Sequence, residues 1–153
     1  MKRNIAIKVH AVAGALALLI ILTFFSSTVV AELRGDIAVI AAVKRYIAYG
    51  LALLIPAMAA VGLTGSRLSG RSQAHPILVK RRRMAVIAAN GILILTPCAL
   101  ALHWLASSGS FGLPFYLIQG LELVAGPVNI ALIALNIRDG LKLSGRLHKK
   151  YAT

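Results

Sequence analysis

The sequence predicts an all-α, polytopic membrane protein built as a bundle of four transmembrane helices. Of its 153 residues, 59% are hydrophobic and 14% are charged, whereas about a quarter of a soluble domain is charged. The formal net charge is nevertheless +13, and the basic residues occupy stretches separate from the apolar ones. This segregation excludes a soluble enzyme and a disordered tail. A single cysteine, Cys98, also excludes an internal disulfide.

Four long apolar runs predict the four helices. A membrane helix needs about 20 mostly apolar residues to cross about 30 Å of hydrocarbon. Within hydrocarbon a helix is favoured because it pairs every backbone N–H and C=O inside its own segment. The connecting segments add no second core, so residues 1–153 form a single membrane domain. We expect the helices at about 9–31, 46–63, 84–106 and 113–137.

The first loop has helical character of its own. Its segment 36–45 begins with an acid, Asp36, and ends with two bases, Lys44 and Arg45, an order that suits the helix dipole. We expect a short interfacial helix at about 36–45, either separate or forming the first turns of the second span.

The charges predict the orientation. Fourteen of the seventeen basic residues fall in the N-terminal residues, a loop at 64–83 and a tail at 138–153, which alternating spans place on one side. The positive-inside rule then makes both termini cytoplasmic, in a multi-pass protein of a bacterial inner (plasma) membrane. The bases directly before the third helix are expected to contact anionic phospholipid headgroups, and not nucleic acid. They are Lys80, Arg81, Arg82 and Arg83.

One alternative concerns residues 1–31, which resemble a secretory signal peptide with small residues before Glu32. The apolar run is longer than the apolar region of such a signal peptide, which usually has about 7–15 residues. An uncleaved helix is therefore the preferred interpretation.

The fourth run carries a polar and small-residue stripe. Gln119, Glu122, Gly126 and Asn129 recur at spacings of three and four residues, which places them on one helix face. Because a charge in hydrocarbon costs about 2.5–3.5 kcal/mol on insertion scales, this face should point into the bundle. The candidate partners of Glu122 are His103, Arg45 and Lys44. Two interpretations stay open: interhelical hydrogen bonding, or a proton, ion or ligand path centred on Glu122.

The four histidines raise the question of a b-type haem. In the predicted topology His10 lies near the cytoplasmic side of the membrane and His103 near the opposite side. The two histidines therefore cannot share an iron. His10 and His75 lie on the same predicted side, so haem binding remains an alternative only through this pair. No metal site and no P-loop, GxSxG or HExxH motif occurs in the chain. We therefore expect neither a cofactor nor catalytic activity.

The leading functional hypothesis is a non-catalytic accessory or scaffolding subunit of the membrane. Its partners would be the lipid bilayer and another membrane subunit or a second copy of the chain. Two alternatives are retained: a redox anchor that binds haem or quinone, and a small proton-coupled transporter or channel centred on Glu122.

Overall fold

The computed structural model describes residues 2–70 and 74–143 and is all-helical. Four of its helical segments are long and apolar enough to cross a membrane, which confirms the predicted number and type of elements. The third segment is a continuous rod made of α3, the π-helix η1 and α4. The elements are α1 (Arg3–Arg34), α2 (Ile37–Ser69), α3 (His75–Asn90), η1 (Gly91–Leu95), α4 (Thr96–Ser107) and α5 (Leu113–Leu143).

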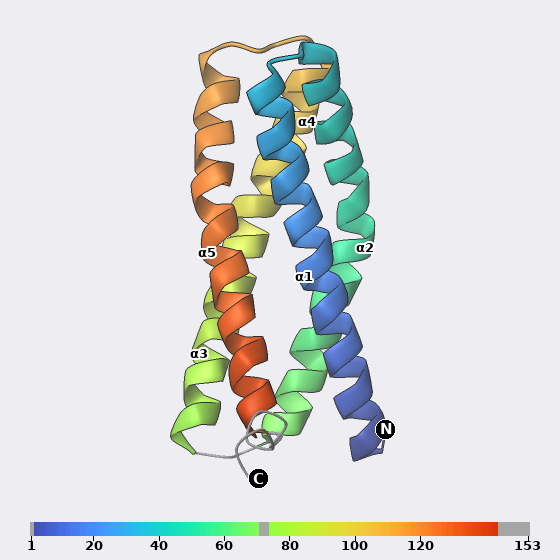
Figure 1. Ribbon diagram of the computed structural model, residues 1–153, viewed down its shortest axis with the longest axis vertical. Coiled ribbons are helices and arrows are strands. Elements are labelled where there is room, and N and C mark those ends of the chain that lie inside the picture. The colour runs from blue at the N-terminus through green and yellow to red at the C-terminus, as the bar shows by residue number, and fades with distance from the viewer. Residues whose placement is uncertain (1, 71–73, 144–153) are drawn as a thin grey trace, which may run out of the picture.

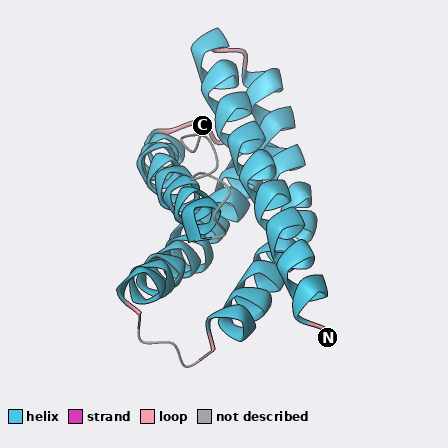
Figure 2. Cartoon of the chain, turned by 60° about the horizontal axis from the view of Figure 1, so that its bottom comes forward, coloured by secondary structure: helices cyan, strands magenta, loops and turns pink. Residues whose placement is uncertain are grey.

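The four rods stand side by side in a long bundle (Figure 1). α1 packs against α2 and α5, and α4 packs against the same two helices. α3 packs against α5 and makes few contacts with α2, and the two helices lie apart in the lower half of Figure 1. The view from below shows the same separation of the helices at that end (Figure 2). We call this end, where α1 begins, the basic end, and the other the loop end.

The helices extend beyond the predicted spans. Residues 36–45 are the N-cap and first turns of α2, the second of the two interpretations left open. The predicted basic loop at 64–83 is mostly helical, because α2 continues to Ser69 and α3 begins at His75. Likewise α5 continues into the predicted tail, of which residues 144–153 lie outside the described part of the chain. Hydropathy marks the apolar part of each helix, whereas backbone hydrogen bonding continues past it.

Two residues make the turn between α1 and α2. Gly35 adopts a left-handed conformation at φ 66°, which glycine accepts without strain, and its N–H donates to the carbonyls of Ala31 and Glu32. Asp36 then caps α2, because its carboxylate accepts from the N–H groups of Ala38 and Val39. The end of α1 and the beginning of α2 are thus separated by two residues only, and the chain reverses its direction in one tight turn.

Pro97 explains the irregularity in the third rod. Proline has no amide hydrogen, so it cannot donate to the carbonyl one turn earlier. The preceding residues Gly91–Leu95 form a π-helix, a wider turn that is often found at functional positions. Pro56 and Pro127, by contrast, lie inside helices α2 and α5 that continue through them.

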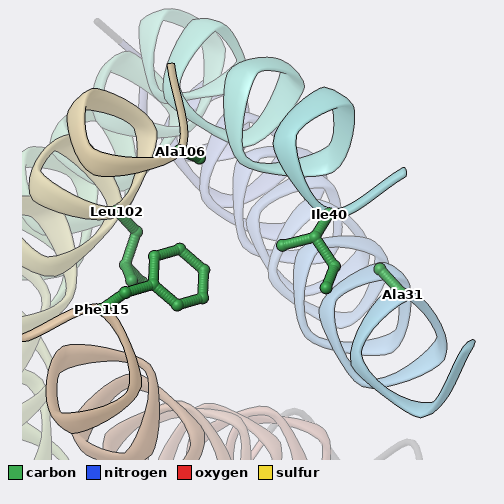
Figure 3. Close-up of a cluster of buried hydrophobic side chains, with 5 residues drawn as sticks. All are labelled: Ala31, Ile40, Leu102, Ala106 and Phe115. Carbon is green, nitrogen blue, oxygen red and sulfur yellow. The ribbon is translucent and has the colours of Figure 1, made fainter. Parts of the chain in front are cut away.

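Apolar side chains close the loop end of the bundle. Phe115 and Leu102 meet across α5 and α4, and Ile40 meets Ala31 across the α1–α2 turn (Figure 3). We call these residues the end cluster, which also includes Ala106. Because all five are at most 5% exposed, the end cluster shields the interior below it. The outer surface is also apolar, with exposed side chains such as Leu19 and Val124.

Small residues set the spacing of α1 and α2. A Cβ added at Gly14 would touch Val61 of α2, and Ala17, one turn further, is 1% exposed. Replacing Ala17 by Leu should therefore force the two helices apart and lower the free energy of unfolding by about 1–3 kcal/mol. Thermal unfolding in detergent micelles measures this change.

The matched control is Ala15→Leu, since Ala15 is exposed on the same helix. It should leave the unfolding temperature close to that of the unsubstituted protein. Equal effects of the two substitutions would contradict the assigned packing face of α1.

Candidate ion-pair site and interhelical cavity

A buried ion pair joins α2 to α5. The Nζ of Lys44 lies 2.6 Å from Oε2 of Glu122, and the two side chains are 1% and 14% exposed. The same ammonium donates to Oγ1 of Thr28 on α1 at 3.4 Å. Gln119, one turn before Glu122, donates from Nε2 to the same Oε2 at 3.3 Å. One lysine thus connects three helices.

Lys44 is one of the three predicted candidate partners of Glu122, whereas Arg45, predicted to belong to the polar cluster, does not contact it. Successive helical residues point about 100° apart, as follows from 3.6 residues per turn. Because residues 36–45 are part of α2, Lys44 lies on the buried face with Ile40, Ile47 and Leu51. Arg45 is exposed. Counted from Ile40, Lys44 follows after four residues, Ile47 after seven and Leu51 after eleven, which is the spacing of one helix face. This pattern in the sequence would have identified Lys44 as the inward-facing base.

His103 also lies apart from Glu122. Its ring packs edge-on against Tyr49, with centroids 6.0 Å apart, and its Nδ1 lies 3.2 Å from the hydroxyl of Ser107. Among the described residues, only Lys44 and Gln119 lie within hydrogen-bonding distance of Glu122.

The predicted polar stripe of α5 does face the interior. Gln119, Asn129 and Asn136 are 3%, 2% and 6% exposed. Asn129 forms a second polar contact, because Nδ2 of Asn90 on α3 donates to its Oδ1 and to the carbonyl of Ala125, both at 3.0 Å. This contact holds α3 to α5 directly before the π-helix.

Glu32 is a member of the site that the sequence reasoning missed. It lies one turn after Thr28 on α1, interacts electrostatically with both Lys44 and Glu122, and keeps Oε1 buried without a partner among the described residues. Oε1 of Gln119 is buried and unpartnered in the same way. Glu32 falls just beyond the first predicted span, which ends at residue 31, in a loop where a charged side chain is ordinary, so hydropathy does not single it out. We call Thr28, Glu32, Lys44, Gln119 and Glu122 the Lys44 cluster.

A cavity of about 520 Å³ lies between the helices, next to this cluster. Its walls come from every helix and are apolar except for four side chains. Those four are Thr28, Thr96, Glu122 and Asn129. Thr28 and Glu122 are also the two residues that Lys44 bridges, so one end of the cavity borders the ion pair.

Exposed residues mark where the cavity opens. Ala59 and Gly62 of α2, and Ala85 and Ala88 of α3, line it and are exposed. These two helices make few contacts with each other and lie apart in the lower half of Figure 1. The cavity therefore opens sideways, between α2 and α3, onto the apolar outer surface.

The remaining predicted residues lie at the basic end. Nδ1 of His10 lies 3.0 Å from Oγ1 of Thr64 on α2, while His75 is exposed at the first position of α3. No group of three or more His, Cys, Asp or Glu side chains suited to a metal ion occurs in the described part of the chain.

The four bases at this end have different surroundings. Arg81 and Arg82 are exposed. Arg83 forms an ion pair with Asp139 of α5 at 2.6 Å, and Lys80 lies against Gly140 of the same helix. Two of the four bases therefore contact α5, and two point outwards.

Comparisons with protein-family models, with curated proteins and with solved structures find no match to this chain.

The first test of the site is Lys44→Met, which keeps the length of the side chain and removes its charge. It leaves Glu122 partly buried without a cation, and breaking a buried pair in this way costs about 3–5 kcal/mol. We expect a loss of this order in the free energy of unfolding, measured by denaturation in detergent micelles.

Arg83→Met is the matched control, because it removes the cation of the more exposed Arg83–Asp139 pair. Exposed pairs contribute little to stability, so the unfolding temperature should hardly change. A Lys44→Met protein as stable as the Arg83→Met protein would contradict the buried pair.

Proposed function

We propose that the protein is a non-catalytic, multi-pass membrane protein that binds an apolar molecule from the hydrocarbon phase of the bilayer. The molecule would have an apolar body and at least one hydroxyl that can donate a hydrogen bond, as in a long-chain alcohol or a quinol. The observation that carries this proposal is the cavity that opens sideways between α2 and α3 and ends at Glu122.

The size and lining of the cavity support a ligand of this kind. Binding pockets for small molecules span about 300–1,000 Å³ and are mostly apolar, with a few polar groups that fix the orientation. The cavity, at about 520 Å³, lies within this range. Its lateral opening suits a ligand that arrives from lipid and not from water.

Glu122 supplies the acceptor for the donor of the ligand. Both hydrogen bonds that the described residues donate to this carboxylate go to Oε2, and Oε1 receives neither of them. Because Glu122 lines the cavity, a hydroxyl that reaches this end would find a charged acceptor. Hydrogen bonds to charged groups contribute about 1.5–3 kcal/mol.

The proposed setting follows from the charge distribution. With the basic end on the cytoplasmic side, both termini lie in the cytoplasm of a bacterial cell, and Arg81 and Arg82 reach anionic headgroups. In this setting the protein would serve as an accessory subunit that presents its ligand to another membrane protein or to a second copy.

The cavity and the ion pair bear on both alternatives retained from the sequence, the redox anchor that binds haem or quinone and the proton-coupled transporter. A quinol has the donor and the apolar body that the cavity suits, so the quinone-binding anchor is one version of this proposal. The haem version has less support, because His10 contacts Thr64 and His75 is exposed. A proton-coupled transporter would use the same Glu122, with Lys44 as its counter-ion.

Native mass spectrometry of the purified protein tests the proposal with two probes of equal chain length. Dodecanol carries a hydroxyl donor, and dodecyl methyl ether does not. We expect dodecanol to bind at least about tenfold more tightly, the affinity ratio that corresponds to about 1.4 kcal/mol. Equal binding of the two probes would contradict the role of Glu122 as acceptor.

A second arm locates the binding site. Ala59→Trp places a large ring at the opening of the cavity and should abolish dodecanol binding. Ala52→Trp is the matched control, since Ala52 is exposed on the same helix but does not line the cavity. If both variants bind dodecanol like the unsubstituted protein, the ligand does not occupy this cavity.

A further inference from the structure

The Lys44 cluster contains two carboxylates but only one ammonium. Glu32 on α1 and Glu122 on α5 both interact electrostatically with Lys44, and also with each other. With all three side chains ionised, the cluster would hold one negative charge in excess. An uncompensated carboxylate with a buried oxygen is costly, and such groups often bind a proton instead.

The hydrogen bonds show the same imbalance. Oε1 of Glu32 and Oε1 of Gln119 are buried and have no donor among the described residues, although buried polar atoms are almost always paired. Gln119 is 3% exposed, and its amide is held in the cluster by the bond from Nε2 to Glu122. One of these unpaired acceptors thus belongs to the carboxylate of Glu32 itself and the other to Gln119 of the same cluster, and a proton on Glu32 would turn its carboxyl group into a donor.

We infer that the Lys44 cluster binds one exchangeable proton, held by the carboxyl group of Glu32 while Lys44 is paired with Glu122. Protonation of Glu32 removes the excess charge and converts an acceptor into an O–H donor. When Glu32 releases the proton, its carboxylate competes with Glu122 for the ammonium of Lys44. The two glutamates thus alternate as the partner of one lysine.

The titratable groups around Glu32 leave few other places for this proton. Lys44 of α2 and Glu122 of α5 interact with it electrostatically. The thiol of Cys98 on α4 interacts with the same pair, but a thiol is neutral in its protonated form and adds no charge. Arg34 and Arg45 are exposed. Glu32 is the carboxylate without a hydrogen bond from the cluster.

The positions of the two glutamates indicate that the proton would be exchanged at the loop end and not through the cavity. Glu32 lies near the end of α1, two residues before Arg34, and is only partly buried. Glu122 instead lines the cavity. A proton that enters or leaves at the loop end therefore changes how firmly Lys44 holds the carboxylate at the cavity. The inference does not depend on the proposed ligand, because the proton is bound in its absence.

Infrared spectroscopy of the purified protein tests the inference, because a protonated carboxylic acid has a C=O band separate from those of carboxylates. The chain has only four acidic side chains: Glu32, Asp36, Glu122 and Asp139. We expect one such band at neutral pH that disappears as the pH is raised. It should shift when the protein contains isotope-labelled glutamate, and stay in place with labelled aspartate.

Two variants assign the band to Glu32. Glu32→Gln, a neutral analogue of the protonated side chain, should remove the band and reduce by one the number of protons released on alkalinisation. Glu32→Asp should keep the band but make it respond to labelled aspartate. This second variant separates proton binding from a loss of folding.

Three outcomes would overturn the inference. The first is the absence of a protonated-acid band in the unsubstituted protein at neutral pH. The second is a band that persists in Glu32→Gln. The third is a band that still responds to labelled glutamate in Glu32→Asp, which would place the proton on Glu122.

Discussion

The ammonium of Lys44 is the constraint on which the arrangement of the bundle depends. A lysine that is 1% exposed among apolar helices has no water to solvate its charge, so protein groups must do so. Glu122 supplies the opposite charge and Thr28 a further acceptor. These partners fix the axial positions of α1, α2 and α5 relative to one another. A shift of one helical turn, about 5.4 Å, would break the ion pair.

The ion pair and the cavity have complementary roles. On the loop side the end cluster (Figure 3) begins one helical turn from the pair, since Ile40 precedes Lys44 by four residues on α2, and the apolar cavity borders the pair on the other side. Both neighbours are apolar, and a surrounding of low dielectric constant strengthens the attraction between Lys44 and Glu122. The cavity in turn acquires one charged acceptor in otherwise apolar walls, and this gives it chemical selectivity.

Much of this structure could be predicted from the sequence, and the limits have physical causes. Apolar runs and segregated bases predict four helices, and the spacing of Gln119, Glu122 and Asn129 predicts an inward stripe on α5. The partner of Glu122 could not be fixed, because that choice depends on where α2 begins. Asp36 caps the helix, and this start turns Lys44 inwards and Arg45 outwards. Glu32 was missed for a related reason, since hydropathy ends the first span before the helix itself ends.

A double-mutant cycle between Lys44 and Glu122 tests the central claim most directly. The free energy of unfolding in detergent micelles would be measured for Lys44→Met, for Glu122→Gln and for the two together. If the pair organises the bundle, the double variant should be more stable than the Lys44→Met protein, with a coupling energy within about 0.5–3 kcal/mol. Additive effects of the two substitutions would show that Lys44 and Glu122 do not interact, and would contradict the arrangement described above.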